Sequence, residues 1–284
     1  MSLPPADPLD ADAILSGLPE PRWIDRILVL ESTASTNDVI AGLAREGARA
    51  GVAVFAEEQT AGRGRLGRRW QSDPRLGLWF SLLLRPDFPF VQWPRLTLWI
   101  AYAVARGIRR YAGQCLGAAT IPGIMLKWPN DLYVSGRKLA GILVETSLGE
   151  NAYAVAGIGL NVNHPSFPPP LDAIATSLRI ETGSPLARNA LAAAILTSLD
   201  STFSLLPSHF HEIIEWATQA DCLRGRSISA AAGSTLYEGA AQGLDSDGAL
   251  LLRTPAGALV RLTSGEVTRF SFAGGWEPKN LSIP

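Results

Sequence analysis

One segment of the chain, residues 62–69, combines glycine and arginine in a way that suits an anion. Its sequence, GRGRLGRR, holds three glycines and four arginines. Glycine lets a backbone approach a ligand closely, and arginine supplies a planar fork of donors for phosphate or carboxylate. The segment therefore predicts a loop that is mobile when empty and becomes ordered around an anion. A solvated basic turn would also explain the arginines, but it does not explain three glycines at this spacing.

The same glycines match G-x-G-x-x-G, so a dinucleotide-binding fold is the first alternative. That fingerprint needs a helix directly after the glycines and an acidic residue about 20 positions further on. Here Pro74 and Gly77 follow the glycines, and the later position falls in SLLLR, which holds no acid. The dinucleotide interpretation therefore fails on its context. No GxxxxGK[ST] sequence occurs either, which argues against a P-loop ATPase.

Two lysines are candidates for contact with a phosphate. Lys127 lies in LKWPND, where a Trp-Pro corner holds its ammonium close and Asn130 and Asp131 add an amide and a carboxylate. Such a set could neutralise an α-phosphate and help to hold a divalent ion, although a tight turn with Lys127 in solvent explains the hexapeptide equally well. Lys138 begins the apolar run RKLAGILVE. It is either a charge at a strand edge or an ammonium that meets a carboxylate in a pocket.

A fourth segment, GIGLNVN at residues 157–163, alternates glycine with asparagine and an apolar residue. The glycines would let a ligand approach while the amides donate and accept hydrogen bonds, or they would simply permit close packing. Other catalytic signals are missing from the sequence. The three histidines lack metal-site spacing, the two cysteines form no CxxC, and no GxSxG occurs.

The elements that must position these segments alternate between strands and helices. Apolar runs predict strands, and helical spacing follows Ser35, a candidate N-cap, and Pro94, a candidate first-turn residue. A third helix, predicted to be amphipathic, covers residues 188–206. The predicted strands are 26–32, 52–59, 77–86, 131–134, 138–148 and 152–162, and Ser135-Gly136 is a predicted turn.

The pattern changes near residue 223, where short strands begin to alternate with Gly-containing turns. This spacing predicts a small barrel or sandwich. We therefore expect a poorly ordered leader at 1–25, a catalytic domain at 26–222 and a small β domain at 223–284.

Composition limits the class of protein. The chain has 284 residues, is 47% hydrophobic and carries a net charge of −1, so it is a folded protein without the basic excess of a nucleic-acid binder. No signal peptide and no apolar run long enough for a membrane span occurs. We expect a cytoplasmic protein that does not bind membranes.

Taken in order, these segments resemble the biotin protein ligase family over residues 27–270. The resemblance rests on Ser35-Thr36-Asn37, EEQTAGRGRLGRRW, KWPNDLY, GRKLAGILVE, GIGLNVN and a C-terminal GEV. It implies an α+β fold, with a mixed sheet and helices like the class II aminoacyl-tRNA synthetase core, plus a small SH3-like barrel. It also implies an enzyme, a biotin–[biotin carboxyl-carrier protein] ligase, which forms biotinyl-5'-AMP from biotin and ATP with Mg²⁺.

The resemblance also implies roles for individual residues. Lys127 would assist adenylation at the α-phosphate, and Lys138 would contact the biotin carboxylate and the phosphate. Arg63, Gly64 and Arg65 would close over biotinyl-adenylate. The expected catalytic residues are Lys127, Arg65 and Lys138. Asp131 would serve the Mg²⁺ of ATP. The expected biotin-binding residues are Ser35, Thr36, Asn37, Gln59, Arg63, Gly64, Arg65 and Lys138, and the expected adenylate-binding residues are Gly62, Trp70, Asn130, Asp131 and Asn161.

The implied partner is the biotin carboxyl carrier protein of acetyl-CoA carboxylase or a related carboxylase, and a homodimer is compatible with the family. Repressors of the family carry a DNA-binding domain before the catalytic domain. Because the first expected strand starts near residue 26, we expect the monofunctional type, without DNA binding. Arg75-Leu76, before Gly77, departs from the family pattern, in which a small residue and an Asn are common. Two alternatives remain: a lipoate or octanoate ligase on the same fold, and a non-catalytic RNA- or peptide-binding module.

Overall fold

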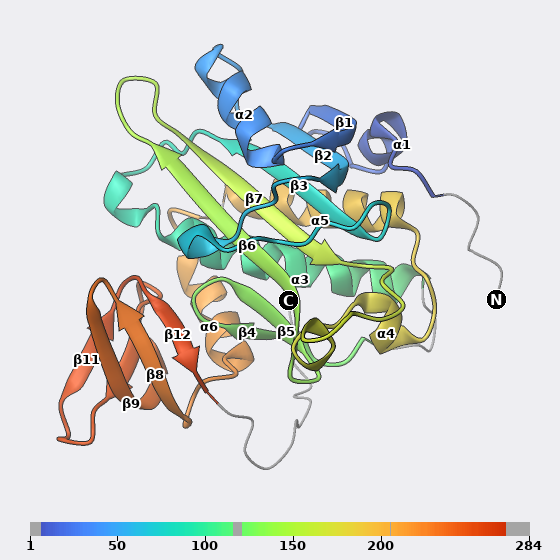
Figure 1. The fold of residues 1–284 in the computed structure, drawn as a ribbon. Coiled ribbons are helices and arrows are strands. Elements are labelled where there is room, and N and C mark those ends of the chain that lie inside the picture. Colours follow the sequence, from blue (N-terminus) through green and yellow to red (C-terminus); the bar gives the residue numbers. More distant parts are fainter. Residues whose placement is uncertain (1–6, 116–120, 205, 271–284) are drawn as a thin grey trace.

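A seven-stranded mixed sheet forms the centre of the molecule (Figure 1). The structure is a computed structural model that describes residues 7–115, 121–204 and 206–270. The strand order is β1-β2-β3-β7-β6-β5-β4; β1 and β2 run parallel, and the other neighbours are antiparallel. The strands are β1 (Arg26–Thr33), β2 (Val52–Gln59), β3 (Gly77–Leu84), β4 (Met125–Lys127), β5 (Asp131–Val134), β6 (Arg137–Ser147) and β7 (Tyr153–Asn161).

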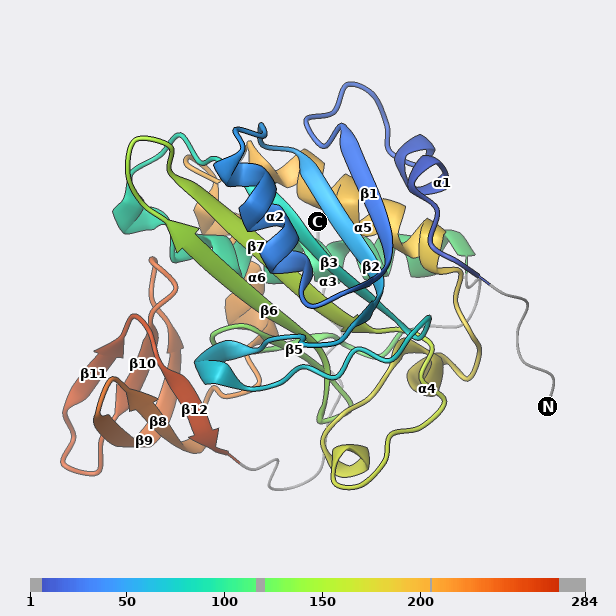
Figure 2. The ribbon, with the colours of Figure 1, turned by 45° about the horizontal axis from the view of Figure 1, so that its top comes forward.

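Helices cover both faces of this sheet (Figures 1 and 2). On one face, α2 (Thr36–Arg45) packs on β2, β3 and β7. On the other face lie α3 (Arg95–Cys115) and α5 (Arg188–Phe203), which pack against each other. The expected helices after Ser35 and Pro94 are confirmed, but the Ser35 side chain makes no capping hydrogen bond.

The helix at 188–203 is not amphipathic as predicted. Arg188 and every residue from Leu191 to Leu199 are buried, because α3 packs against one side of the helix while α1 (Ala11–Ser16) and the sheet cover others. A helix buried on most sides needs no polar face. The predicted end at 206 was also too late, since the helix ends at Phe203.

The expectation of a poorly ordered leader does not hold for residues 7–25; residues 1–6 lie outside the described ranges. Asp10 caps α1 by accepting a 2.7 Å hydrogen bond from the Ala13 N–H. Ile14 and Leu18 join the main core. Burying such a side chain stabilises the fold by about 1.5–3 kcal/mol, which is enough to fix a short segment on its neighbours.

A second sheet follows α6 (Phe210–Ala220) and lies beside the β4–β5 end of the first sheet (Figure 1). Its five antiparallel strands have the order β11-β10-β9-β8-β12, with β11 and β12 at the edges. They are β8 (Ser227–Ala232), β9 (Thr235–Leu244), β10 (Leu250–Arg253), β11 (Leu259–Leu262) and β12 (Glu266–Arg269). The predicted Gly-containing turns between short strands are confirmed: Gly233, Gly248, Gly257 and Gly265 lie between successive strands or next to a strand end, all with positive φ.

The remaining elements are short: α4 (Leu178–Thr182) and the 3-10 turns η1 (Arg65–Gly67), η2 (Phe90–Gln92) and η3 (Leu171–Ala173). Within the described ranges, no helix combines the length and the apolar character of a membrane span. A mixed sheet with helices and a C-terminal antiparallel sheet is therefore the architecture of this chain.

Candidate functional site

A pocket lies where the loop between β2 and β3 crosses β6 and β7. We call this loop, residues 60–76, the flap. The pocket has a volume of about 880 Å³, open to solvent. The flap forms one side, the N-terminus of α2 and the strands β5 to β7 form the base, and β12 of the second sheet contributes an edge.

The floor of the pocket consists of glycines on β6 and β7. Gly141 and Gly159 are partners in the β6–β7 register. A Cβ built on Gly159 would lie 2.5 Å from the Trp70 ring, and one on Gly141 would lie 2.9 Å from it. Trp70, on the flap, therefore rests directly on backbone. A Cβ built on Gly157 would lie 2.2 Å from Asn37 Oδ1. These glycines therefore allow the close packing of side chains that line the pocket.

One end of the pocket is built from neutral polar groups. Gln59 Oε1 accepts hydrogen bonds from the Thr36 N–H at 2.9 Å and the Thr36 hydroxyl at 3.1 Å. Ser81 donates to Asn37 Oδ1 at 2.6 Å. Because Ser35 precedes α2 and lines the same end, hydroxyl and amide groups gather there on three elements. Such groups can both donate to and accept from an uncharged polar ligand.

Arg63 closes this end through two acidic residues. Its guanidinium donates to both carboxylate oxygens of Asp38, at 2.7 and 2.8 Å, and lies 3.2 Å from Glu145 Oε2. The hydrogen bond to Arg63 lowers the pKa of Asp38, and the same bond raises the pKa of Arg63. Asp38 on α2 and Glu145 on β6 therefore hold this arginine in place.

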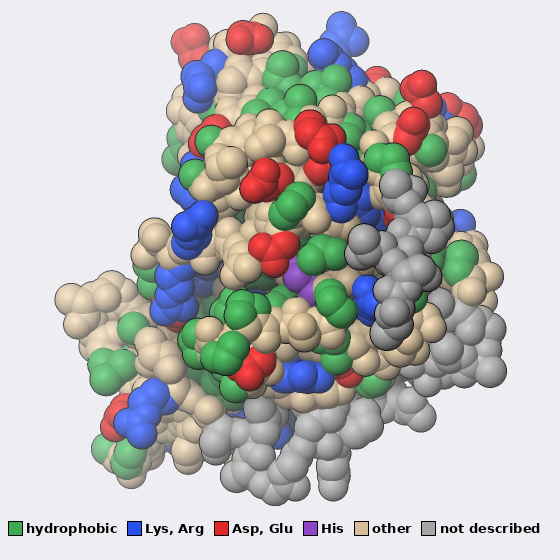
Figure 3. Space-filling view, turned by 45° about the vertical axis from the view of Figure 1, so that its right-hand side comes forward, with side chains coloured by type: hydrophobic (Ala, Val, Ile, Leu, Met, Phe, Trp, Pro, Cys, Tyr) green, Lys and Arg blue, Asp and Glu red, His purple; other side chains and the backbone are tan. Residues whose placement is uncertain are grey.

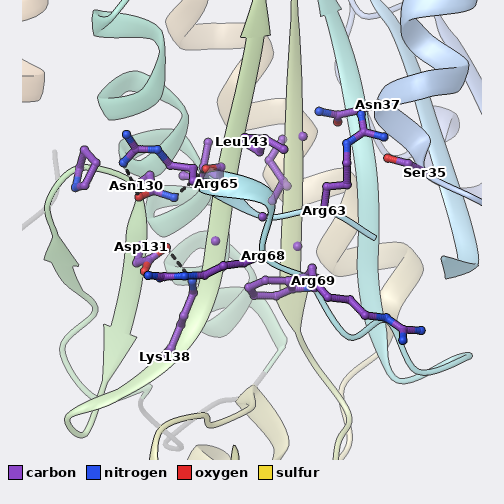
Figure 4. A pocket seen from close by; sticks show the side chains of 18 of the residues that line it. Ser35, Asn37, Arg63, Arg65, Arg68, Arg69, Asn130, Asp131, Lys138 and Leu143 are labelled. Carbon is purple, nitrogen blue, oxygen red and sulfur yellow. Dashed lines mark hydrogen bonds and ion pairs between the residues drawn. The ribbon is translucent and has the colours of Figure 1, made fainter. Parts of the chain in front are cut away.

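The opposite end of the pocket is cationic (Figure 4). There Arg65, Asn130, Asp131 and Lys138 point toward one another. The Lys138 ammonium lies 2.8 Å from Asp131 Oδ1 and 5.1 Å from the centre of the Trp70 ring. Arg65 donates to Asn130 Oδ1 at 3.3 Å, and burial lowers its pKa. Two roles were predicted for Lys138. The structure supports an ammonium that meets a carboxylate in a pocket, and not a charge at a free strand edge.

Lys127, at the end of β4, lines the same end. Its ammonium lies 4.7 Å from the ring centre of Phe270 and 5.9 Å from that of Tyr133. Burial lowers the pKa of Lys127, and Asp131 opposes this change. Lys127 is therefore held against aromatic rings. The alternative of a tight turn with Lys127 in solvent is wrong.

The second sheet holds the flap from outside. Arg65 also donates to the Gly265 carbonyl at 2.9 Å, and Arg68 pairs with Glu266. Both partners belong to the turn and strand at β12, about 200 residues away in the sequence. Glu266 and Val267 line the pocket as well. In the sequence, the C-terminal GEV motif was the one indication that this strand contributes to the pocket.

All predicted site residues line the pocket except Gly62 and Asn161. Gly62 is buried at the base of the flap, where its carbonyl accepts from the Trp70 N–H at 2.9 Å. The Asn161 amide donates to the Thr176 carbonyl at 3.0 Å, behind the pocket. Asn161 therefore lies outside the lining of the pocket, where its amide joins the end of β7 to the segment before α4. Sequence reasoning gave Glu145 and Gly141 no role in the site. It predicted ligand contact for the segments that hold Arg68, Arg69 and the β7 glycines, but it assigned these residues no individual role.

No group of three or more His, Cys, Asp or Glu residues that could hold a metal ion occurs in the part of the chain that the structure describes. Asp131 supplies one carboxylate, already close to Lys138. A divalent ion here would need most of its ligands from elsewhere, as Mg²⁺ commonly takes them from water and a nucleotide's phosphates.

Comparison with known proteins places this geometry in a family. Residues 29–163 match the biotin/lipoate A/B protein ligase family, and residues 225–268 match the biotin protein ligase C-terminal domain. The bifunctional ligase/repressor BirA of Bacillus spizizenii is 35% identical over 254 residues, which is 88% of this chain and 76% of that protein. The biotin–[acetyl-CoA-carboxylase] ligase of Mycobacterium tuberculosis is 33% identical, over 84% of this chain and 87% of that protein.

The solved structures agree. The biotin protein ligase from Aquifex aeolicus, in complex with biotin and ATP, has a TM-score of 0.71 and 29% identity, covering 87% of this chain and 99% of that one. Sequence, fold and a pocket with a cationic end and a neutral polar end thus converge. The chain belongs to the biotin protein ligase family.

Proposed function

We propose that this protein is an ATP-dependent biotin protein ligase. It joins biotin to AMP and then transfers the biotinyl group to a lysine of the carboxyl carrier protein of acetyl-CoA carboxylase or a related carboxylase. The observation that carries the proposal is the pocket itself, in which hydroxyl and amide groups around α2 face a cluster of cations around β4 to β6.

The two ends suit the two halves of biotinyl-5'-AMP. The uncharged ureido ring of biotin both donates and accepts hydrogen bonds, which fits Ser35, Thr36, Asn37 and Gln59. Phosphate fits the cationic end. Arg63, at the neutral end, and Gly64 lie on the flap, and the Trp70 indole N–H has no acceptor among the described residues. A bound ligand would supply one as the flap orders around it.

In the first step, a biotin carboxylate oxygen attacks the α-phosphorus of ATP, the bond to the bridging oxygen breaks, and pyrophosphate leaves. Such transfers are accelerated mainly by alignment and by cations that meet the developing charge. Lys127 and Lys138 are fixed, by aromatic rings and by Asp131, to supply that charge. Arg65 adds a third cation from the flap and helps to exclude water from the mixed anhydride.

Mg²⁺ would be carried by the ATP phosphates and neutralise part of their charge. Among the described residues, the carboxylate of Asp131 and the amide oxygen of Asn130 are the groups at the cationic end that suit it. Asp131 also pairs with Lys138, so its substitution would remove that ion pair together with a carboxylate that would hold the ion.

In the second step, the neutral amine of the acceptor lysine attacks the carbonyl carbon of the anhydride, and AMP leaves with the bonding electrons. The amine proton passes to a general base. The relative from Mycobacterium tuberculosis is named for acetyl-CoA carboxylase, which supports a carrier domain of that enzyme as the acceptor.

We further propose that the boundary between the catalytic and C-terminal domains lies near residue 222, and that the five antiparallel strands after it form an SH3-like barrel. The sheet begins at Ser227, soon after α6 ends at Ala220, which supports this division. A homodimer, a cytoplasmic location and the lack of DNA binding stay predictions.

The test is to incubate the protein with biotin, ATP, Mg²⁺ and an isolated carboxyl-carrier domain and to weigh the carrier by mass spectrometry. The carrier should gain one biotinyl group, and a carrier whose acceptor lysine is replaced by arginine should gain none. Pyrophosphate exchange with biotin, lipoate and octanoate separates the related activities. Exchange with lipoate or octanoate but not biotin would contradict the proposal.

The non-catalytic alternative receives little support. On the face shown in Figure 3, Lys and Arg side chains lie among Asp and Glu, without one broad basic patch. This distribution agrees with the net charge of −1 and is unlike that of a typical nucleic-acid surface.

A further inference from the structure

A buried ion pair lies directly beneath the flap, outside the pocket. Arg188 opens α5 and is 1% exposed, while Glu57 on β2 is 2% exposed. The guanidinium donates to Glu57 Oε2 at 2.6 Å and to Oε1 at 3.1 Å. Such a two-pronged contact fixes direction as well as distance.

The pair touches both ends of the flap. Glu57 lies just before the flap, because β2 ends at Gln59, and its carbonyl accepts from the Arg75 N–H at 3.2 Å. Gly77, the first residue after the flap, offers its carbonyl to the same guanidinium nitrogen of Arg188 at 3.3 Å. One side chain from a helix far away in the sequence thus connects the strand that enters the flap to the strand that leaves it.

The segment before α1 covers this arrangement. The Arg188 N–H donates to Asp7 Oδ2 at 2.8 Å, and the guanidinium also donates to the Asp7 carbonyl. The Leu9 N–H donates to Glu57 Oε1 at 2.6 Å. Water is therefore excluded from the pair on the side away from the sheet.

We propose that Glu57 and Arg188 are positioning residues for ligation, acting as a clamp that sets the two ends of the flap. Removing two charges from water is costly, and an apolar pair of similar size would often stabilise a core equally well. What an apolar pair cannot do is bond Gly77 and orient β2. Arg63, Arg65 and Trp70 all lie between the clamped ends, so the clamp determines where they meet the adenylate.

The kinetic test of this inference, release of biotinyl-adenylate, rests on the proposed function. Its second test, hydrogen–deuterium exchange of the flap, does not. In the free protein, hydrogen–deuterium exchange of residues 60–76 reports flap opening without any ligand. The variants are Arg188→Lys, which keeps the charge but loses the fork, and Glu57→Gln, which keeps the shape but loses the charge. The double variant Glu57→Leu with Arg188→Met keeps an apolar filling if either single variant fails to fold.

Thr202→Val is the matched control. Thr202 lies on the same helix, and its hydroxyl accepts a buried 2.8 Å hydrogen bond from Trp99 far from the flap. We expect flap amides to exchange at least several-fold faster in the clamp variants and unchanged in the control. Biotinyl-adenylate should also leave the clamp variants several-fold faster, with the KM values for biotin and ATP raised more than kcat is lowered.

A folded clamp variant with wild-type flap exchange would overturn the inference. If the flap exchanges faster but the wild-type protein itself forms no biotinyl-adenylate, the clamp stands and the proposed function fails. If the wild type forms adenylate and the variants retain it normally despite faster exchange, the clamp does not position the flap for ligation, and the inference fails.

Discussion

Gly141 and Gly159 face each other across β6 and β7, and the indole of Trp70 lies over both. Neither position leaves room for a side chain. The flap can therefore approach the sheet more closely here than any other residue pair would allow. This contact makes the floor of the pocket the most direct place to test the site.

Gly159→Ala should weaken nucleotide binding without unfolding the protein. The new Cβ would lie 2.5 Å from the Trp70 ring. The indole must therefore move away from β7, and the flap cannot pack on the sheet as it does in the wild type. We expect the KM for ATP to rise about tenfold, or about 1.4 kcal/mol. Pyrophosphate exchange at saturating biotin and varied ATP measures the change. Gly113→Ala, where a Cβ meets open space on α3, should bind normally, and equal binding by both variants would refute the role of the floor.

Lys127→Met should lose adenylation while keeping or raising stability. Burial lowers the pKa of Lys127 below its ordinary value of 10.5, so its charge destabilises the folded state at neutral pH. This penalty disappears as the pH rises through the lowered pKa toward 10.5. We expect adenylation to fall about 100-fold, with Tm unchanged or higher, and Lys127→Arg to retain more activity. A large drop in Tm would instead indicate a structural role.

The pH profile of the wild-type enzyme gives a second test of Lys127. If its ammonium serves the α-phosphate, kcat/KM for ATP falls on the alkaline side at a pH below 10.5, because that constant reports groups of the free enzyme. The profile of Lys127→Arg should lack this fall, since guanidinium stays charged.

Arg65→Ala should fold normally and release biotinyl-adenylate early. Arg65 is the flap residue that bonds both Asn130 and the Gly265 carbonyl. Its loss therefore removes the contacts of the flap with β5 and with the second sheet at once. Filter binding of labelled adenylate should show release at least about tenfold faster. Arg75→Ala serves as the control, since Arg75 is on the same flap but pairs with Glu31 outside the pocket. Unchanged retention in Arg65→Ala would contradict the role of Arg65.

His164 should make the protein acid-sensitive. It is buried, stacks on Phe167 at 4.8 Å and lies near Trp79, and burial lowers its pKa to about 4. As the pH falls below 6.5, the unfolded chain binds a proton first, so the free energy of unfolding decreases by up to about 3 kcal/mol near pH 4. His164→Phe should remove most of this slope in urea unfolding. Exposed His211→Phe should leave the slope unchanged.

Local pattern predicted much of this fold. The strands β2 and β5 occupy the predicted residues, because alternating or continuous apolar runs between turn residues report burial directly. The three-residue β4 and the helix α6 were missed. A strand of three residues is too short to show a period, and its pairing with β5 defines it.

The pocket lining was predicted in the main, since the family motifs hold most of its residues. Contacts between distant segments were not. Glu57 and Arg188 are 131 positions apart, and neither carries a local sign of its partner. The opposition of Gly141 and Gly159 depends on strand register, and the turn at Gly265 reaches the flap only after the second sheet has docked. Tertiary packing determines which of these residues meet, and a local sequence pattern does not report it.

The pocket edge supplied by β12 has a thermodynamic consequence. A molecule that fills the pocket touches groups from both sheets, so its binding free energy can be realised only while both sheets are folded and in place. Saturation with biotin and ATP should therefore merge the melting of the two sheets into one cooperative transition. A substitution that destabilises either sheet should also weaken binding of the ligand in the shared pocket.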